Sequence, residues 1–172
     1  MTSTRKLKQL WQQLFPWLRV AALIALIAYA LDKGTGPPRY EVSGQARLVD
    51  GDSLFVDGLE IRLKNIDAPE GRQNCHRAGK IWRCGQEATK QLRRFINQRK
   101  VTCTGDHYDK HSRLLAYCTV DGHELNRWMV VEGWAVAFGD YHELERSAKR
   151  GRRGIWSSQF QRPRTWRTKQ RR

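Results

Sequence analysis

The chain has 172 residues, and its 32 Lys and Arg against 17 Asp and Glu give a formal net charge of +15. This length suits one domain that buries a core of its own, and it excludes a peptide too small to do so. The positive charge favours a polyanionic partner, either nucleic acid or an anionic membrane surface. The alternative is a basic face that is only solvated.

The first part of the chain has the features of an export signal. Residues 1–30 carry four basic residues and no acid, and twelve apolar residues run without a break from Val20 to Leu31. A basic stretch, an apolar stretch and an A-x-A motif ending at Ala30 describe a signal peptide. A membrane-spanning helix needs about twenty apolar residues. We therefore expect residues 1–31 to be a cleaved signal peptide or an uncleaved N-terminal membrane anchor, with a buried amphipathic helix as the third possibility.

Composition divides the remainder of the chain into three parts. Residues 32–39 are rich in Gly and Pro, which predicts a linker. Residues 40–158 carry the patterns of a folded domain. Residues 159–172 form a basic tail in which aromatic side chains stand among Lys and Arg, a composition that suits a single-stranded polyanion. The alternative for this tail is a disordered, solvated segment.

Hydrophobic patterns predict an α+β domain. Five short strands with about three helices at one end favour a five-stranded OB-type β-barrel, preceded by the hydrophobic N-terminal segment. A polar loop is expected at residues 71–85. The predicted elements, in chain order, are a strand at 40–49, a hairpin at 53–63, a helix at 86–98, strands at 101–105 and 114–120, and helices at 125–131 and 141–150.

The predicted hairpin has a defined register. Asp57-Gly58 is typical of a two-residue turn with φ > 0 at both positions. Closing the hairpin there pairs Ser53 with Arg62, so that Asp52 lies beside Arg62 at the open end of the two strands. The sequence therefore predicts an arginine and a carboxylate side by side.

Charged residues around this hairpin have the chemistry of a phosphate-binding metal site. Asp52 and Asp67 offer the hard oxygen ligands that Ca²⁺ and Mg²⁺ prefer. The planar fork of donors on Arg62 suits a phosphate, and Glu70 is placed to take a proton from water. The alternative is a surface hairpin whose charges compensate one another.

The four cysteines predict two disulfides. Strand pairing about a turn centred between positions 110 and 111 places Cys103 directly opposite Cys118, within disulfide reach. Cys75 and Cys84 then remain as a pair within one loop, and an even count suits an exported domain. A zinc site is the alternative, but the spacings lack the short C-x₂₋₄-C pair that such sites use.

Four motifs together resemble the staphylococcal nuclease-like (thermonuclease) family. They cover roughly residues 45–157 in the family's order and spacing, so the resemblance extends over most of the chain. The resemblance implies the OB-type fold that the strand pattern also predicts. The motifs are DGDS at 50–53, IRLKNIDAPE at 61–70, DKHSRLLAY at 109–117 and LNRWMVVEGWA at 125–135.

The resemblance also implies roles for six residues. Arg62 and Arg113 match the arginines that hold the scissile phosphate, and Glu70 matches the carboxylate that positions or deprotonates the attacking water. The Ca²⁺ ligands correspond to Asp52, Asp67 and the main-chain carbonyl of Ala68. The family's best-known member has threonine at this last position, and alanine serves equally because the ligand is a backbone oxygen.

Two segments depart from the family's pattern. His111-Ser112 stand where the best-known member has Tyr-Gly, which affects the turn before Arg113. The stretch from Phe138 to Tyr141 is shorter than the corresponding base-stacking segment, and these two aromatic residues are the remaining candidates for nucleotide contacts.

We therefore expect an exported, periplasmic or secreted, Ca²⁺-dependent nuclease. The resemblance implies attack of water at phosphorus with P–O5′ cleavage of DNA, RNA or both. Expected partners are the nucleic-acid substrate and, for the N-terminal segment, the membrane or the export machinery. No protein partner is implied, and we expect a monomer. Two alternatives are a non-catalytic OB-type module that binds nucleic acid or protein, and a membrane-tethered domain whose basic tail binds anionic lipid.

Overall fold

The computed structural model describes residues 16–27, 29 and 39–170. They belong to two compact units, Met1–Pro38 and Arg39–Arg172. The first unit contains a helix at residues 16–27 with exposed apolar side chains. Among the residues described, no helix combines the length and the apolar character needed to cross a membrane. The predicted signal or anchor at 1–31 and the linker at 32–39 lie largely outside the described residues and stay predictions.

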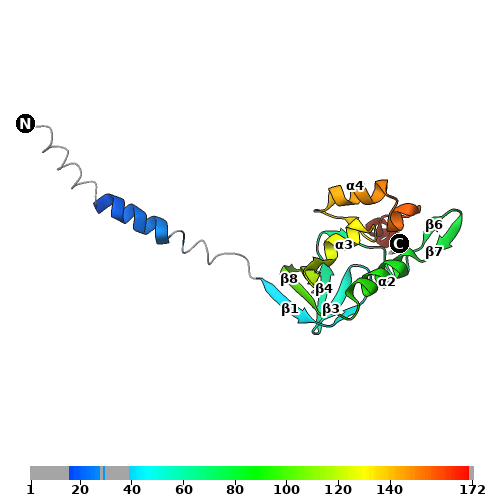
Figure 1. Ribbon diagram of the computed structural model, residues 1–172, viewed down its shortest axis with the longest axis horizontal. Coiled ribbons are helices and arrows are strands. Elements are labelled where there is room, and N and C mark those ends of the chain that lie inside the picture. The colour runs from blue at the N-terminus through cyan, green and yellow to red at the C-terminus, as the bar shows by residue number, and fades with distance from the viewer. Residues whose placement is uncertain (1–15, 28, 30–38, 171–172) are drawn as a thin grey trace, which may run out of the picture. The chain divides into compact units, whose positions relative to one another are not determined.

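The second unit is built on one curled sheet (Figure 1). Its strands are β1 (Tyr40–Gly44), β2 (Ala46–Leu48), β3 (Ser53–Val56), β4 (Leu59–Leu63), β8 (Val101–Tyr108), β9 (Leu114–Val120) and β10 (His123–Glu124). The sheet order is β1-β8-β9-β4-β3-β2, with β10 paired to β9. β1 and β2 are opposite edges of this sheet, although only Gln45 separates them in the chain. The sheet must therefore curl until its edges approach each other, as in a partly closed OB-type barrel.

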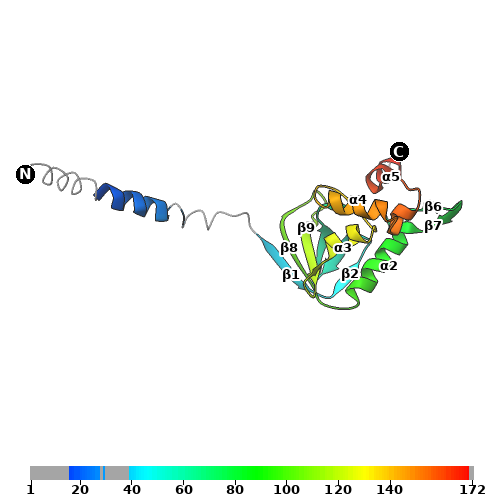
Figure 2. The same ribbon diagram turned by 45° about the horizontal axis from the view of Figure 1, so that its top comes forward.

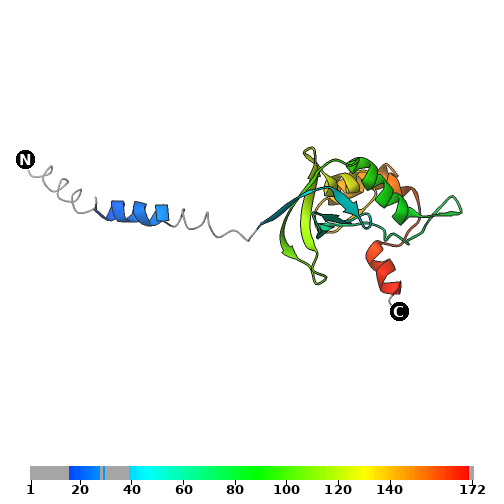
Figure 3. The same cartoon turned by 90° about the horizontal axis from the view of Figure 1, so that it is seen from below.

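Helices cover the curled sheet and confirm the mixed α+β class. They are α2 (Cys84–Ile96), α3 (Leu125–Val131), α4 (His142–Arg150), the 3₁₀ helix η1 (Gly154–Ser157) and α5 (Pro163–Gln170). α3 packs against β9 and lies beside α4 (Figure 2). Figure 3 shows α5 projecting from the body of the domain. The basic tail is thus helical at Pro163–Gln170, in contrast to the disordered segment that was one expectation.

Two small strand pairs were not predicted. β6 (Cys75–Arg77) and β7 (Lys80–Trp82) form a hairpin inside the segment expected to be a polar loop. β5 (Ile66–Asp67) pairs with β11 (Val136–Ala137). Strands of two or three residues carry too little periodic pattern to be recognised in a sequence. The β5–β11 pair matters most because it holds Asp67.

Alternation of side chains explains the barrel core. In β9 every second residue from Leu114 to Val120 is buried, and β8 shows the same pattern from Val101 to Gly105. α2 buries Ala88, Leu92 and Ile96, which lie on one face because they are four residues apart. The apolar faces of these elements join in one cluster inside the curled sheet.

The predicted hairpin register is confirmed. Asp57 and Gly58 have φ of 48° and 78°, as a two-residue hairpin turn requires. Ser53 pairs with Arg62 across β3 and β4. The β8–β9 register also matches the prediction at Cys103 and Cys118. An irregularity between Gly105 and His107 changes the register by one residue in the part of the pair that lies closer to the turn. Nothing in the local sequence pattern signals that bulge.

Both predicted disulfides are present. Cys103 and Cys118 are cross-strand partners and are bonded, and Cys75 is bonded to Cys84. No free cysteine remains among the described residues. Disulfides persist in oxidising compartments, so the two bridges indicate an extracytoplasmic location.

The barrel disulfide should contribute measurably to stability. Replacing both Cys103 and Cys118 with alanine should lower the free energy of unfolding by about 3 kcal/mol, because the bridge restricts the unfolded chain. Urea denaturation of the oxidised proteins measures this difference. Peptide mapping without reductant should recover the two pairs named above. Equal stability of the two proteins, or free thiols in the wild type, would contradict this assignment.

Candidate active site

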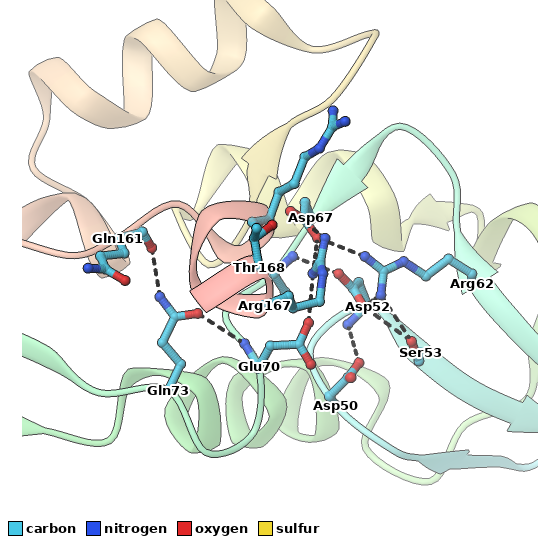
Figure 4. A network of polar contacts seen from close by, with 12 residues as sticks. Asp50, Asp52, Ser53, Arg62, Asp67, Glu70, Gln73, Gln161, Arg167 and Thr168 are labelled. Atoms are coloured by element: carbon cyan, nitrogen blue, oxygen red, sulfur yellow. Dashed lines mark hydrogen bonds and ion pairs between the residues drawn. The ribbon is translucent and has the colours of Figure 1, made fainter. Parts of the chain in front are cut away.

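A buried ion pair lies at the open end of the β3–β4 hairpin (Figure 4). Nη1 of Arg62 is 2.6 Å from Oδ1 of Asp52, and the two side chains are 14% and 2% exposed. The hydroxyl of Ser53 donates a hydrogen bond to the same Asp52 oxygen at 3.2 Å. The hairpin register therefore produces the predicted pair and places it largely out of contact with water.

The same arginine reaches a second carboxylate. Nη2 of Arg62 donates to Oδ1 of Asp67 at 2.8 Å. Asp67 is held by the pairing of β5 with β11, where it lies opposite Val136. The amide of Ala68 donates to Oδ2 of Asp52 at 2.7 Å. The three residues predicted to hold a metal are thus brought together around one guanidinium.

A buried amide side chain holds the segment between β4 and β5 in place. Asn126, in α3, donates to the carbonyls of Lys64 at 2.9 Å and Ala116 at 3.0 Å. Its side-chain oxygen accepts the amide of Cys118 at 3.1 Å. These bonds clamp the chain leading to the site against β9. The sequence analysis missed Asn126, although a polar residue within the apolar run LNRWMVV was a possible signal.

Glu70 follows β5 and is positioned by its backbone. Gln73 is fully buried. Its backbone N–H donates to the Glu70 carbonyl at 2.7 Å, and its side-chain oxygen Oε1 accepts the backbone N–H of Glu70 at 3.3 Å. A Cβ at Gly85 would lie 1.7 Å from the same carbonyl oxygen. The start of α2 therefore approaches Glu70 so closely that only glycine fits at this position.

Arg113 approaches the site from the β8–β9 turn. Its Nε and Nη2 donate to Oδ2 of Asp109 at 2.9 and 2.7 Å. Its Nη1 lies 3.4 Å from the hydroxyl of Ser53, which is also 3.5 Å from Nη1 of Arg62. Ser112 adopts φ of 62°, so the turn keeps a left-handed residue where the family's best-known member has glycine. The two predicted arginines therefore lie on either side of one serine.

A third arginine was not predicted. Nη1 of Arg167, in α5, is 2.8 Å from Oδ1 of Asp67 and 2.6 Å from Oε1 of Glu70. Its Nη2 donates to Oδ2 of Asp67 at 3.2 Å. Figure 4 shows this side chain reaching from α5 to the carboxylates. The sequence analysis included Arg167 only as one of several basic residues of the tail.

Burial and ion pairing shift the pKa values of Asp52, Arg62 and Arg167 in opposite directions. Burial raises the pKa of Asp52 well above its ordinary value, and the neighbouring Arg62 acts in the other direction. Burial alone would lower the pKa of Arg62, but Asp52 and Asp67 outweigh it, so this pKa is raised. The pKa of Arg167 is raised too, because its hydrogen bonds to Asp67 and Glu70 outweigh its burial. Both guanidinium groups are therefore held in their charged form.

The three arginines, Asp67 and Glu70 line a cleft of about 970 Å³, whereas Asp52 and Ala68 are buried behind it. Phe138, one of the aromatic candidates for nucleotide contacts, lies in its wall and is 60% exposed. Tyr141 does not line the cleft, and its hydroxyl donates instead to Glu124. The charged residues that line the cleft are Asp50, Glu60, Arg62, Lys64, Asp67, Glu70, Asp109, Lys110, Arg113, Arg164 and Arg167.

The donor set of Asp52, Asp67 and the Ala68 carbonyl has the right chemistry for a hard divalent cation. The carboxylates of Asp52 and Asp67 meet at one guanidinium, so they lie close enough to act together. No group of three or more His, Cys, Asp or Glu side chains with metal-binding geometry occurs in the described part of the chain. The predicted donor set is therefore limited to two carboxylates and a backbone oxygen, and water or substrate would have to complete the coordination of a cation bound there.

Comparisons with known proteins identify the family of this chain. The family described as "Staphylococcal nuclease homologue" matches residues 60–158. The succinoglycan biosynthesis protein ExoI of Rhizobium meliloti is 32% identical over 81% of this chain and 76% of its own length. An uncharacterized endonuclease of Escherichia coli O157:H7 is 30% identical over 64% of this chain and 74% of its own.

A micrococcal nuclease of Shigella flexneri is 29% identical over 86% of this chain and 93% of its own length. The residues that the family match covers include Arg62, Asp67, Glu70 and Arg113. The match therefore spans more than half of the chain and most of the site. On these grounds the chain belongs to the staphylococcal nuclease homologue family.

Proposed function

We propose that the protein is a nuclease that hydrolyses phosphodiester bonds of DNA, RNA or both. Family membership supports this, as do relatives named as endonucleases and a micrococcal nuclease. The observation that carries the proposal is the convergence of Arg62, Arg113 and Glu70 on one cleft beside two aspartates. Cationic side chains line the same cleft, and they would attract a polyanionic backbone.

The two predicted arginines are suited to bind the scissile phosphate. Arg62 and Arg113 both lie within about 3.5 Å of the Ser53 hydroxyl, so their guanidinium groups converge on one region. Each also has carboxylate partners that hold the planar group in place. Such preorganised donors stabilise the charge that develops on the phosphate in the transition state.

Glu70 is suited to act on water. Its side chain is 24% exposed and lines the cleft, so water reaches it. In the proposed reaction Glu70 accepts a proton as the water oxygen forms a bond to phosphorus. The P–O5′ bond breaks, the 5′ oxygen leaves with a proton from solvent, and the phosphate stays on the 3′ side.

Asp52, Asp67 and the carbonyl of Ala68 would hold the divalent cation, for which we propose Ca²⁺. A cation bound there supplies positive charge that polarises the phosphate. The chain's own residues must hold its ligands in place, and they do so through Arg62 and the β5–β11 pair. We further propose that residues 1–31 act as export signal or anchor for this extracytoplasmic enzyme.

Activity should depend on a divalent cation. The purified full chain should degrade single-stranded DNA in Ca²⁺ and stop when a chelator is added, because two carboxylates form the core of the donor set. Gel electrophoresis of the products, with the 3′ ends analysed for phosphate, measures this. Undiminished cleavage in chelator would refute the cation assignment. DNA binding without cleavage in any divalent cation would favour the non-catalytic module.

Two single substitutions should separate catalysis from folding. Glu70→Gln and Arg113→Ala should each lower kcat by about 10²-fold or more, because each removes a group that acts in the transition state. Thermal unfolding should change little, since both side chains are partly exposed. The matched controls Glu143→Gln and Arg146→Ala break an exposed ion pair on α4 outside the cleft and should keep full activity. A Glu70→Gln protein within a few-fold of wild type would remove Glu70 from the mechanism.

Arg62 should behave differently from Arg113. Arg62→Ala leaves the buried Asp52 without its guanidinium, and removing one partner of a buried pair costs about 3–5 kcal/mol. We therefore expect Arg62→Ala to lose stability as well as turnover. A double variant, Arg62→Met with Asp52→Asn, should recover much of the stability but no activity. Urea denaturation measures these changes, and an Arg62→Ala protein as stable as wild type would contradict the role of the pair.

A further inference from the structure

The segment that leads into α5 is firmly attached to the domain. The side-chain amide nitrogen of Gln73, Nε2, donates to the backbone carbonyl of Gln161 at 2.7 Å. Arg162 pairs with the buried Glu145 at 2.9 Å, and Pro163 is itself buried. The short strand bridge between His76 and Gln159 lies just before these contacts. The start of α5 is therefore placed beside the cleft whatever the rest of the helix does.

One face of α5 is turned toward the site. Arg164, Arg167 and Thr168 line the cleft, at the three- and four-residue spacing of one helix face. Trp166 and Gln170 line a second hollow instead. Arg167 is the residue of this face that reaches the carboxylates, and its side chain is 32% exposed.

The contacts of Arg167 use the lone pairs that a metal ion would need. Each oxygen of an ionised carboxylate has about two lone-pair positions. Oδ1 of Asp67 accepts from both Arg62 and Arg167, and Oδ1 of Asp52 accepts from Arg62 and Ser53. Oδ2 of Asp67 also accepts from Arg167. Both oxygens of Asp67 are thus engaged by guanidinium groups.

A guanidinium and a divalent cation compete for the same lone pairs of a carboxylate oxygen. The guanidinium directs N–H groups at the lone pairs, whereas a metal ion must coordinate those lone pairs directly. Two positive groups at hydrogen-bonding distance from one carboxylate also repel each other. A cation that coordinates the Asp67 oxygens facing Arg167 would therefore compete with Arg167 for them.

We propose that α5 is an autoinhibitory strap, in which Arg167 competes with the divalent cation for Asp67 and Glu70. With α5 docked, Arg167 engages both oxygens of Asp67 and Oε1 of Glu70 at the wall of the cleft. Cation binding at Asp67 displaces Arg167 and releases Oε1 of Glu70 from its guanidinium partner. This inference rests on the cation site of the proposed function, although its main test measures binding rather than hydrolysis.

The docking of α5 is weak enough to be reversed. The helix has eight residues and buries only Pro163 among them, and isolated helices this short are marginal in water. The Arg167 side chain is 32% exposed, so solvent screens part of its attraction to the carboxylates. α5 also carries basic residues and no acid, so a bound nucleic acid would attract it away from the carboxylates.

The test compares Ca²⁺ affinity in the purified full chain with that of two variants. Arg167→Ala should bind Ca²⁺ about tenfold more tightly than wild type in isothermal titration calorimetry, because the competitor is gone. Lys169→Ala removes the same charge from the same helix, but Lys169 does not line the cleft. Its Ca²⁺ affinity should stay within about twofold of wild type, which controls for the general loss of positive charge.

Hydrogen exchange provides the second readout. Ca²⁺ should raise amide exchange over residues 164–170 in the wild type, because α5 is released, and should leave exchange in α3 unchanged. The proposal would be overturned if Arg167→Ala and wild type bound Ca²⁺ with equal affinity. It would also be overturned if Ca²⁺ did not change the amide hydrogen exchange of α5. Loss of hydrolysis in Arg167→Ala with unchanged Ca²⁺ affinity would overturn it too, since Arg167 would then be a catalytic residue.

The binding and hydrolysis results separate the two proposals. Tighter Ca²⁺ binding by Arg167→Ala with no hydrolysis by any variant would support the strap and refute the nuclease. If wild type and Arg167→Ala both hydrolyse DNA and their activities depend on Ca²⁺ concentration in the same way, the nuclease is supported and the strap is refuted. Failure of wild type and Arg167→Ala alike to bind Ca²⁺ would refute the competition itself.

Discussion

The position of the Arg62 guanidinium between Asp52 and Asp67 is the interaction on which the site depends. Buried charges destabilise a fold unless they are paired and hydrogen-bonded. Here one guanidinium pairs with two carboxylates from different segments of the chain. A shift of one residue in the β3–β4 register would turn Arg62 to the other face of the sheet. The Asp57-Gly58 turn prevents this shift, so a two-residue turn determines where the charges of the site lie.

The rest of the barrel acts mainly to hold these groups still. Asn126 clamps the chain after β4, and the β5–β11 pair holds Asp67. Gln73 and the close approach at Gly85 hold the backbone of Glu70. Catalytic groups must be placed to within about 0.5 Å to act together. The backbone contacts around the site supply that precision without using the side chains that would touch a substrate.

The proposed release of Arg167 would give the site a second state. With α5 docked, the carboxylates are neutralised by arginines alone, and the groups suited to chemistry are engaged with one another. The proposed strap would keep Asp67 and Glu70 engaged until a divalent cation and a polyanion compete for the same charges. Such a device requires a weakly docked element with two alternative sets of partners, and α5 has the size and charge for it.

Local patterns in the sequence determined much of this protein. The Asp57-Gly58 turn determined the hairpin register and so the Asp52–Arg62 pair, and antiparallel pairing about the turn near residues 110 and 111 placed Cys103 opposite Cys118. These features depend on residues close in sequence, for which turn chemistry and side-chain period are sufficient. The family motifs added the roles proposed for Glu70 and Arg113.

Tertiary structure alone decided the remaining contacts. Asn126 meets a carbonyl 62 residues away, and Arg167 meets Asp67 across 100 residues. No local pattern distinguishes Arg167 from the other basic residues of the tail, because its role arises only when the packing of residues 159–163 aims α5 at the cleft. Partners so distant in sequence are chosen by packing, and packing is a property of the whole folded chain.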